Sequence, residues 1–94
     1  MAPKNQTRKL GRNMATMHGV NHWYKREFEK LGWMVLAKAK GYTDKVDSYK
    51  KSVDRLIYTI QNLKTEYENH NRKHDLNVLL AESKILQAFV KKHF

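Results

Sequence analysis

The amino-acid sequence predicts an all-α fold, either a small three-helix bundle or a long helical hairpin with a flanking helix, behind an extended basic N-terminal arm. Beyond residue 20, apolar residues recur three and four positions apart, which is the spacing of an amphipathic helix. No stretch alternates apolar and polar residues as a β-strand would. The 94 residues are enough for one domain with a small core.

Residues 1–20 form the predicted arm, because they show no apolar period and contain Pro3, Gly11 and Gly19. Residues 1–26 hold six Lys or Arg and no acidic residue, so they carry +6 of the net charge of +10. Such a local excess is typical of segments that bind polyanions, although a solvated tail has the same composition. The predicted polyanion contacts, from the arm and the first two helices, are Lys4, Arg8, Lys9, Arg12, Lys25, Arg26, Lys50, Lys51 and Arg55.

Residues 21–94 form the predicted helical domain, and its first helix spans about 21–40. Asn21 can cap its start and Gly41 can end it. With 100° between successive residues, one side of the helix is assigned to the core. The predicted core residues are Tyr24, Phe28, Leu31 and Val35. The opposite side holds Trp23, Trp33, Met34 and Ala37.

The second helix is predicted over 44–70 from the strongest regularity in the chain. Its apolar residues follow alternating steps of three and four through three heptads, as in helices that pack lengthwise on one another. The residues that follow this pattern, all predicted to be core, are Val46, Tyr49, Val53, Leu56, Ile60, Leu63 and Tyr67.

The third helix is predicted over 75–92, with Asp75 as its cap. Residues 69–74 break the apolar period without a Gly or Pro, so one continuous bent helix remains an alternative. The apolar residues of its predicted core stripe are Leu76, Leu79, Leu80, Leu86 and Val90, and Ser83 lies among them. The opposite side carries Val78, Ala81, Ile85, Ala88 and Phe89.

Two of the three predicted helices are therefore apolar on both sides. A small bundle needs one apolar stripe per helix, so the second sides predict a surface that docks another protein. The alternative is that both sides are used inside the bundle. The predicted interface residues are Trp23, Trp33, Met34, Ala37, Val78, Ile85 and Phe89.

No motif for catalysis or cofactor binding is present in the sequence. It lacks cysteine, a glycine-rich phosphate loop and a nucleophile motif, so we expect a protein that is not an enzyme and binds no cofactor. Two His-x3-His pairs, His18 with His22 and His70 with His74, are weak candidates for metal ligands. We interpret them as solvated histidines near helix ends and predict no metal site.

Four segments, HGVNHWYKREFEKLGWMVLAKAKG, YKKSVDRLIYTI, NRKHDLNVLL and FVKKHF, resemble short basic proteins encoded by large nucleocytoplasmic DNA viruses of protists and algae. The resemblance covers roughly residues 18–94. It carries over no activity and no functional residue. It implies a viral protein found in the virion and in the infected cell's cytoplasm or nucleus, and not secreted.

From these observations we expect a structural or assembly protein, namely a minor capsid or internal virion component. It would dock through its apolar helix faces and basic arm to its own copies or to capsid or core proteins, as an oligomer or as part of a larger assembly. The alternative is a nucleic-acid-binding protein that coats or packages viral DNA without sequence preference. We expect no membrane span, because no apolar run approaches the roughly 18 residues required.

Overall fold

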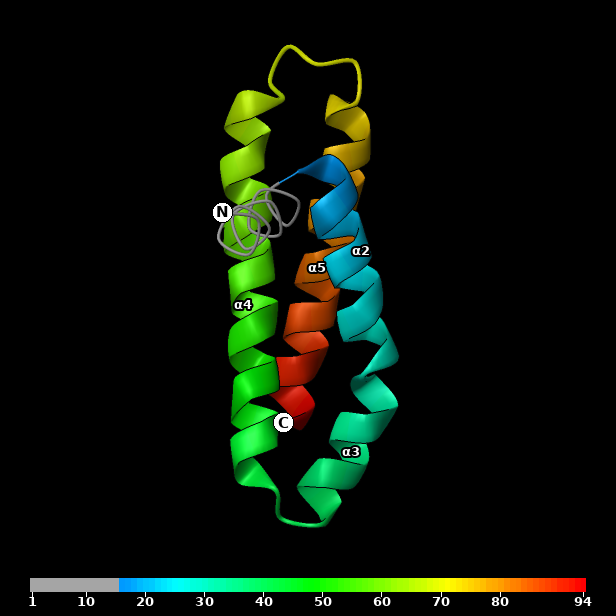
Figure 1. The fold of residues 1–94 in the computed structure, drawn as a ribbon, viewed down its shortest axis with the longest axis vertical. Helices are drawn as coiled ribbons and strands as arrows, with labels where there is room; N and C mark the ends of the chain where they lie inside the picture. The colour runs from blue at the N-terminus through cyan, green and yellow to red at the C-terminus, as the bar shows by residue number, and fades with distance from the viewer. Residues whose placement is uncertain (1–15) are drawn as a thin grey trace, which may run out of the picture.

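The computed structural model describes residues 16–94, and within them it contains helices and no strand. The helices are α2 (Met17–Glu29), α3 (Leu31–Ala39), α4 (Thr43–Glu66) and α5 (Lys73–His93). Helices α2 and α3 follow each other as one column, beside the columns of α4 and α5 (Figure 1). The predicted all-α bundle is thereby confirmed.

Helix α2 begins four residues earlier than the sequence predicts. Thr16 is its N-cap, and the Thr16 hydroxyl accepts a hydrogen bond from the Gly19 amide at 3.0 Å. Met17 and Val20 are buried, so the predicted boundary of the arm at residue 20 was wrong. The predicted arm contacts Lys4, Arg8, Lys9 and Arg12 lie outside the described residues.

The predicted first helix is divided in two at Lys30. This residue ends α2, with its amide bonded to the carbonyls of Arg26 and Phe28, and it also precedes the first residue of α3. Figure 1 shows that α3 continues the column of α2 in a changed direction. A face extrapolated at 100° per residue from α2 therefore does not continue unchanged into α3.

The buried face of α2 is centred on Glu27, which is 1% exposed. A hydrophobic pattern assigns a glutamate to solvent, and the predicted core was therefore centred one residue away, on Phe28. In the structure Phe28 is 56% exposed and Val35 is 52% exposed, so both were wrongly assigned to the core. Tyr24 and Leu31, which lie nearer to Glu27 around the helix, are half-buried and pack against the core.

A Schellman motif at Gly41 turns the chain from α3 into α4. The Gly41 amide donates to the Lys38 carbonyl at 3.0 Å, and the Tyr42 amide donates to the Ala37 carbonyl at 2.8 Å. Gly41 has a φ of +81°, a conformation in which a side chain would be strained. The predicted end of the first helix at Gly41 is thus explained.

The regular stripe of α4 forms the centre of the bundle. The stripe residues Val46, Tyr49, Val53, Leu56, Ile60 and Leu63 are all buried, and Tyr67 is half-buried. One cluster consists of Met17, Val20, Leu56, Ile57, Ile60, Leu63, Leu76, Leu79 and Leu80. A second cluster consists of Tyr49, Val53, Leu86 and Val90. Ser83, within the α5 stripe of core residues, is fully buried as well.

Helices α4 and α5 are separate, which excludes the continuous bent helix. Helix α4 ends at Glu66 and α5 begins at Lys73, two residues before the predicted cap Asp75. The turn between them is held locally. The ring of His70 packs 4.7 Å from the ring of Tyr67, and its Nδ1 accepts a hydrogen bond from the Arg72 amide.

Truncating Leu56 and Phe28 should have very different effects on stability. Leu56 is fully buried, so Leu56→Ala should lower the free energy of unfolding by about 2–5 kcal/mol. Phe28→Ala removes a mostly solvated ring and should cost about 1 kcal/mol or less. Urea unfolding followed by circular dichroism measures both. Equal losses would contradict the placement of Phe28 outside the core.

Candidate docking surfaces

Three of the predicted interface residues are used inside the bundle. Trp23 packs against the first cluster, and its Nε1 donates a hydrogen bond to the Ser52 hydroxyl of α4 at 3.2 Å. Met34 packs against the second cluster, and Ala37 is buried. The prediction that these three residues form a free surface was therefore wrong. They face α4 because the buried side of the column passes through Glu27.

A first exposed apolar surface lies at the α3 end of the bundle. We define the α3 patch as Trp33, Leu36 and Tyr42, of which Trp33 is 71% exposed. Together with Lys40, Lys45 and the buried edge of α3, they line a cavity of about 250 Å³. The Lys45 ammonium lies 5.5 Å from the centre of the Tyr42 ring, within the range of a cation–π contact. The sequence pattern predicted Trp33 as an interface residue, but it did not predict Leu36 or Tyr42.

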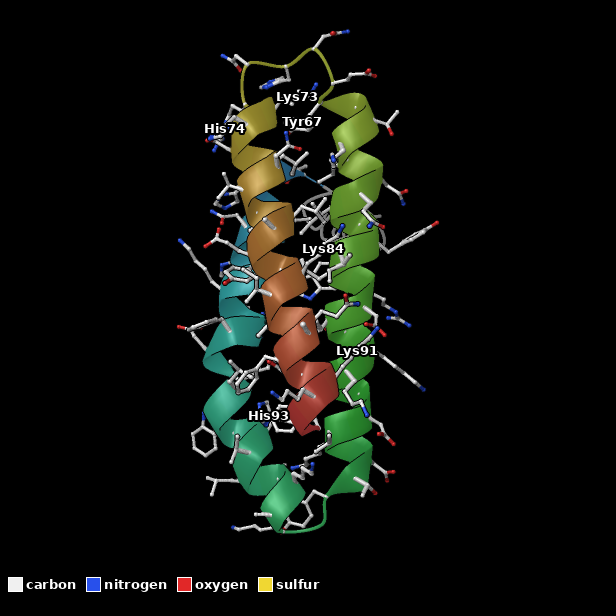
Figure 2. The ribbon with its side chains drawn as sticks, turned by 180° about the vertical axis from the view of Figure 1, so that it is seen from behind. Tyr67, Lys73, His74, Lys84, Lys91 and His93 are labelled. Carbon is white, nitrogen blue, oxygen red and sulfur yellow. The ribbon has the colours of Figure 1, made fainter. Side chains whose placement is uncertain are left out.

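A second exposed apolar surface runs along the outer side of α5. We define the α5 stripe as Val78, Ile85 and Phe89, of which Ile85 is 71% exposed. Their spacing of seven and four residues keeps them on one side of the helix, and the buried residues occupy the other. Figure 2 views the molecule with this helix toward the reader. The structure thus leaves all three residues accessible, as an interface requires.

Charged residues of opposite sign lie on the two sides of α5. On the side toward α4, Lys73, Lys84 and Lys91 follow one another at spacings of eleven and seven residues, about 120–140° around the helix from the α5 stripe. Figure 2 shows Lys84 and Lys91 on the side of α5 that faces α4. On the other side, about 40° around the helix from Val78, Glu82 borders the α5 stripe. Burial and, to a smaller extent, the negative charge of Glu82 raise the pKa of Tyr24 above its ordinary value.

A groove between α2–α3 and α4 contains the buried Glu27. Its cavity of about 480 Å³ is also lined by Lys30, Asp44, Ser48, Tyr49 and Ser52 among others. One Glu27 carboxylate oxygen pairs with the Lys30 ammonium at 3.3 Å, and the other has no partner within residues 16–94. The main-chain carbonyl of Glu27 also accepts a hydrogen bond from α4.

Tyr49 ties α4 to α2 next to this carboxylate. The Tyr49 hydroxyl donates a hydrogen bond to the main-chain carbonyl of Glu27 at 2.6 Å. Burial, with a smaller effect from the negative charge of Glu27, raises the pKa of the Tyr49 hydroxyl far above its ordinary value. The neutral, hydrogen-bonding form of Tyr49 is consequently the one that the folded state favours.

The described members of the predicted polyanion set do not come together. Lys25 and Arg26 are exposed on α2, where they line separate hollows on different sides of the helix. Lys51 and Arg55 are exposed on the outer side of α4. Lys50 is half-buried, and its ammonium donates to the carbonyl of Phe94 at 3.3 Å. The structure therefore gives these five residues no common surface.

The histidine pairs have no additional ligand that would complete a metal site. His18, His22, His70 and His74 are all exposed. Within residues 16–94, no group of three or more His, Cys, Asp or Glu side chains is arranged to hold a metal ion. No helix in the same range combines the length and apolar character that crossing a bilayer requires.

Comparison of the chain with protein-family models, with curated proteins and with solved structures found no match.

Replacing Tyr49 by Phe should change how stability depends on pH. The variant loses one buried hydrogen bond, which should cost about 1 kcal/mol at neutral pH. The pKa of Tyr49 is higher in the folded than in the unfolded state, so its contribution is complete below about pH 10 and is lost as the pH rises further. Above that pH the gap between parent and variant should narrow, by at most about 1.4 kcal/mol per pH unit. Urea unfolding at several alkaline pH values measures this gap, and a constant gap would contradict the prediction.

Proposed function

We propose that this chain is a non-enzymatic assembly protein whose copies join by docking the α3 patch of one copy on the α5 stripe of the next. The observation that carries the proposal is the exposure of Trp33 and Ile85, each 71% accessible, at the centres of two separate apolar surfaces. Burying a large apolar side chain contributes roughly 1.5–3 kcal/mol. Tryptophan and phenylalanine are also enriched at the centres of protein interfaces.

Charge favours contact between patch and stripe over contact between two stripes. The α3 patch is flanked by Lys40 and Lys45, and one edge of the α5 stripe carries Glu82. A contact between patch and stripe can bring these opposite charges together. Two stripes packed antiparallel would instead place their Glu82 edges side by side, and like charges across an interface cost free energy. The second copy is therefore expected to bind in a different orientation from a symmetric dimer.

A contact between two different surfaces can repeat, because each copy still has one surface free. Such head-to-tail contacts form rings or open chains, which suits a structural component. The net charge of +10 opposes assembly, but repulsion beyond about 8 Å is largely screened at physiological salt. We place this function in a viral particle, as a minor capsid or internal component, on the strength of the resemblance to proteins of large DNA viruses.

Two single variants test the proposal through their mixture. Trp33→Ser removes the patch and leaves the stripe, whereas Phe89→Ser removes the stripe and leaves the patch. Each variant alone should be monomeric in sedimentation velocity at concentrations up to about 100 µM, well above a modest Kd of about 10 µM. The parent should form dimers and larger species. An equimolar mixture of the variants should form dimers and nothing larger, because one intact patch can meet one intact stripe.

Tyr58→Ser supplies the matched control. Tyr58 is an exposed aromatic residue on α4, outside both surfaces, so its loss should leave assembly unchanged. A parent that stays monomeric throughout this concentration range would overturn the proposal. Assembly of Trp33→Ser on its own would also overturn it, because that result requires stripe-to-stripe contact.

A further inference from the structure

Five lysines gather along the seam between α4 and α5. Figure 2 shows three of them, Lys73, Lys84 and Lys91, on α5. Helix α5 supplies Lys73, Lys84 and Lys91, which the helical period aligns within about 20° of each other. Helix α4 supplies Lys50 and Lys64, which are fourteen residues apart and within about 40°. We call these five residues the lysine track.

One hydrogen bond fixes how the two rows lie beside each other. The Gln87 amide of α5 donates to the Asp54 carboxylate of α4 at 2.7 Å across the seam. The two helices are antiparallel neighbours, so this contact places Lys50 level with Lys91. Lys64 then lies between the levels of Lys73 and Lys84. At 1.5 Å per residue the track spans about 27 Å.

The track has more positive than negative charge. No ion pair within residues 16–94 involves any of its five lysines. Asp54 lies on the seam, where the neutral Gln87 amide binds it without removing its charge, and Asp47 and Glu68 lie near the two ends. Four of the lysines are exposed, and the half-buried Lys50 donates to the Phe94 carbonyl. Five lysines beside three carboxylates leave an excess of positive charge along the row, so it attracts an elongated anion.

We propose that the lysine track binds the phosphate backbone of duplex nucleic acid, without sequence preference. Its length corresponds to about eight base pairs at 3.4 Å per pair. Lysine presents a single mobile charge and does not offer the paired donors that read a guanine edge, so the contacts are to phosphates and not to bases. The track lies outside the α3 patch and about 120–140° around α5 from the α5 stripe, so the inference does not depend on the proposed self-assembly.

Salt dependence of binding to a fluorescent 20-base-pair duplex tests the inference, with the full chain and fluorescence anisotropy as the readout. The track variant is Lys73→Gln, Lys84→Gln and Lys91→Gln. Losing three phosphate contacts should reduce the log–log slope of affinity against salt by about 2.7, at about 0.9 per contact, with at least a tenfold loss of affinity near 100 mM salt. All three side chains are exposed, and circular dichroism checks that the fold is kept.

The matched control is Lys25→Gln, Lys51→Gln and Arg55→Gln. It removes the same net charge from exposed residues away from the seam, one on α2 and two on the outer side of α4. For this control, the log–log slope of affinity against salt should fall by less than about 1 relative to the parent. Equal effects of the two triple variants, or no effect of the track variant, would overturn the proposal. Equally tight competition by poly-L-glutamate at matched charge would do so too, because it would show that any polyanion suffices.

Discussion

The contact between Tyr49 and the main-chain carbonyl of Glu27 lies on the side of the first column that faces the bundle. It joins α4 to the last turn of α2, just before the division at Lys30. With Glu27 held against α4, Phe28 must point outward, one step of 100° away. The same orientation turns Met34 and Ala37 inward on α3 and leaves Trp33 in solvent. The accessible α3 patch is thus the outward side of a column whose other side packs against the core.

Keeping a carboxylate at this position has an energetic cost. Glu27 has one ion pair, to a Lys30 ammonium that is itself half in solvent, and one oxygen without a partner in the described structure. Removing a charge from water is rarely offset in full by a single pairing, so an apolar residue of similar size could give a more stable bundle. Buried polar groups can instead select one register among several of similar stability. That explanation suits this column, because its apolar residues lie on both sides and either side could otherwise pack against the bundle.

The parts of the fold that the sequence predicted are those where hydrophobicity and burial agree. The heptads of α4 and the leucine-rich side of α5 have apolar residues at nearly every buried position, so their period gave the correct core. On the first helix the apolar period predicted the wrong core side, because a charged residue, Glu27, lies at the centre of the buried side. The charged surface was missed for a related reason. Lys73, Lys84 and Lys91 are periodic too, but a periodicity is normally sought among apolar residues. Lys50 and Lys64 join them only through the pairing of α4 with α5, which no single-helix pattern contains.

The proposed self-assembly and the proposed nucleic-acid binding would be linked, because charge affects both. Each added copy would bring more positive charge, so repulsion between copies opposes the contact between patch and stripe. A phosphate backbone lying on Lys84 and Lys91 would lower that repulsion. A ligand that binds the assembled form more tightly than the free copy favours assembly. Assembly must then raise the affinity for that ligand by the same factor. Successive copies also present successive tracks, so binding along one duplex gains from high effective concentration. In this way two individually weak contacts can support a single stable assembly.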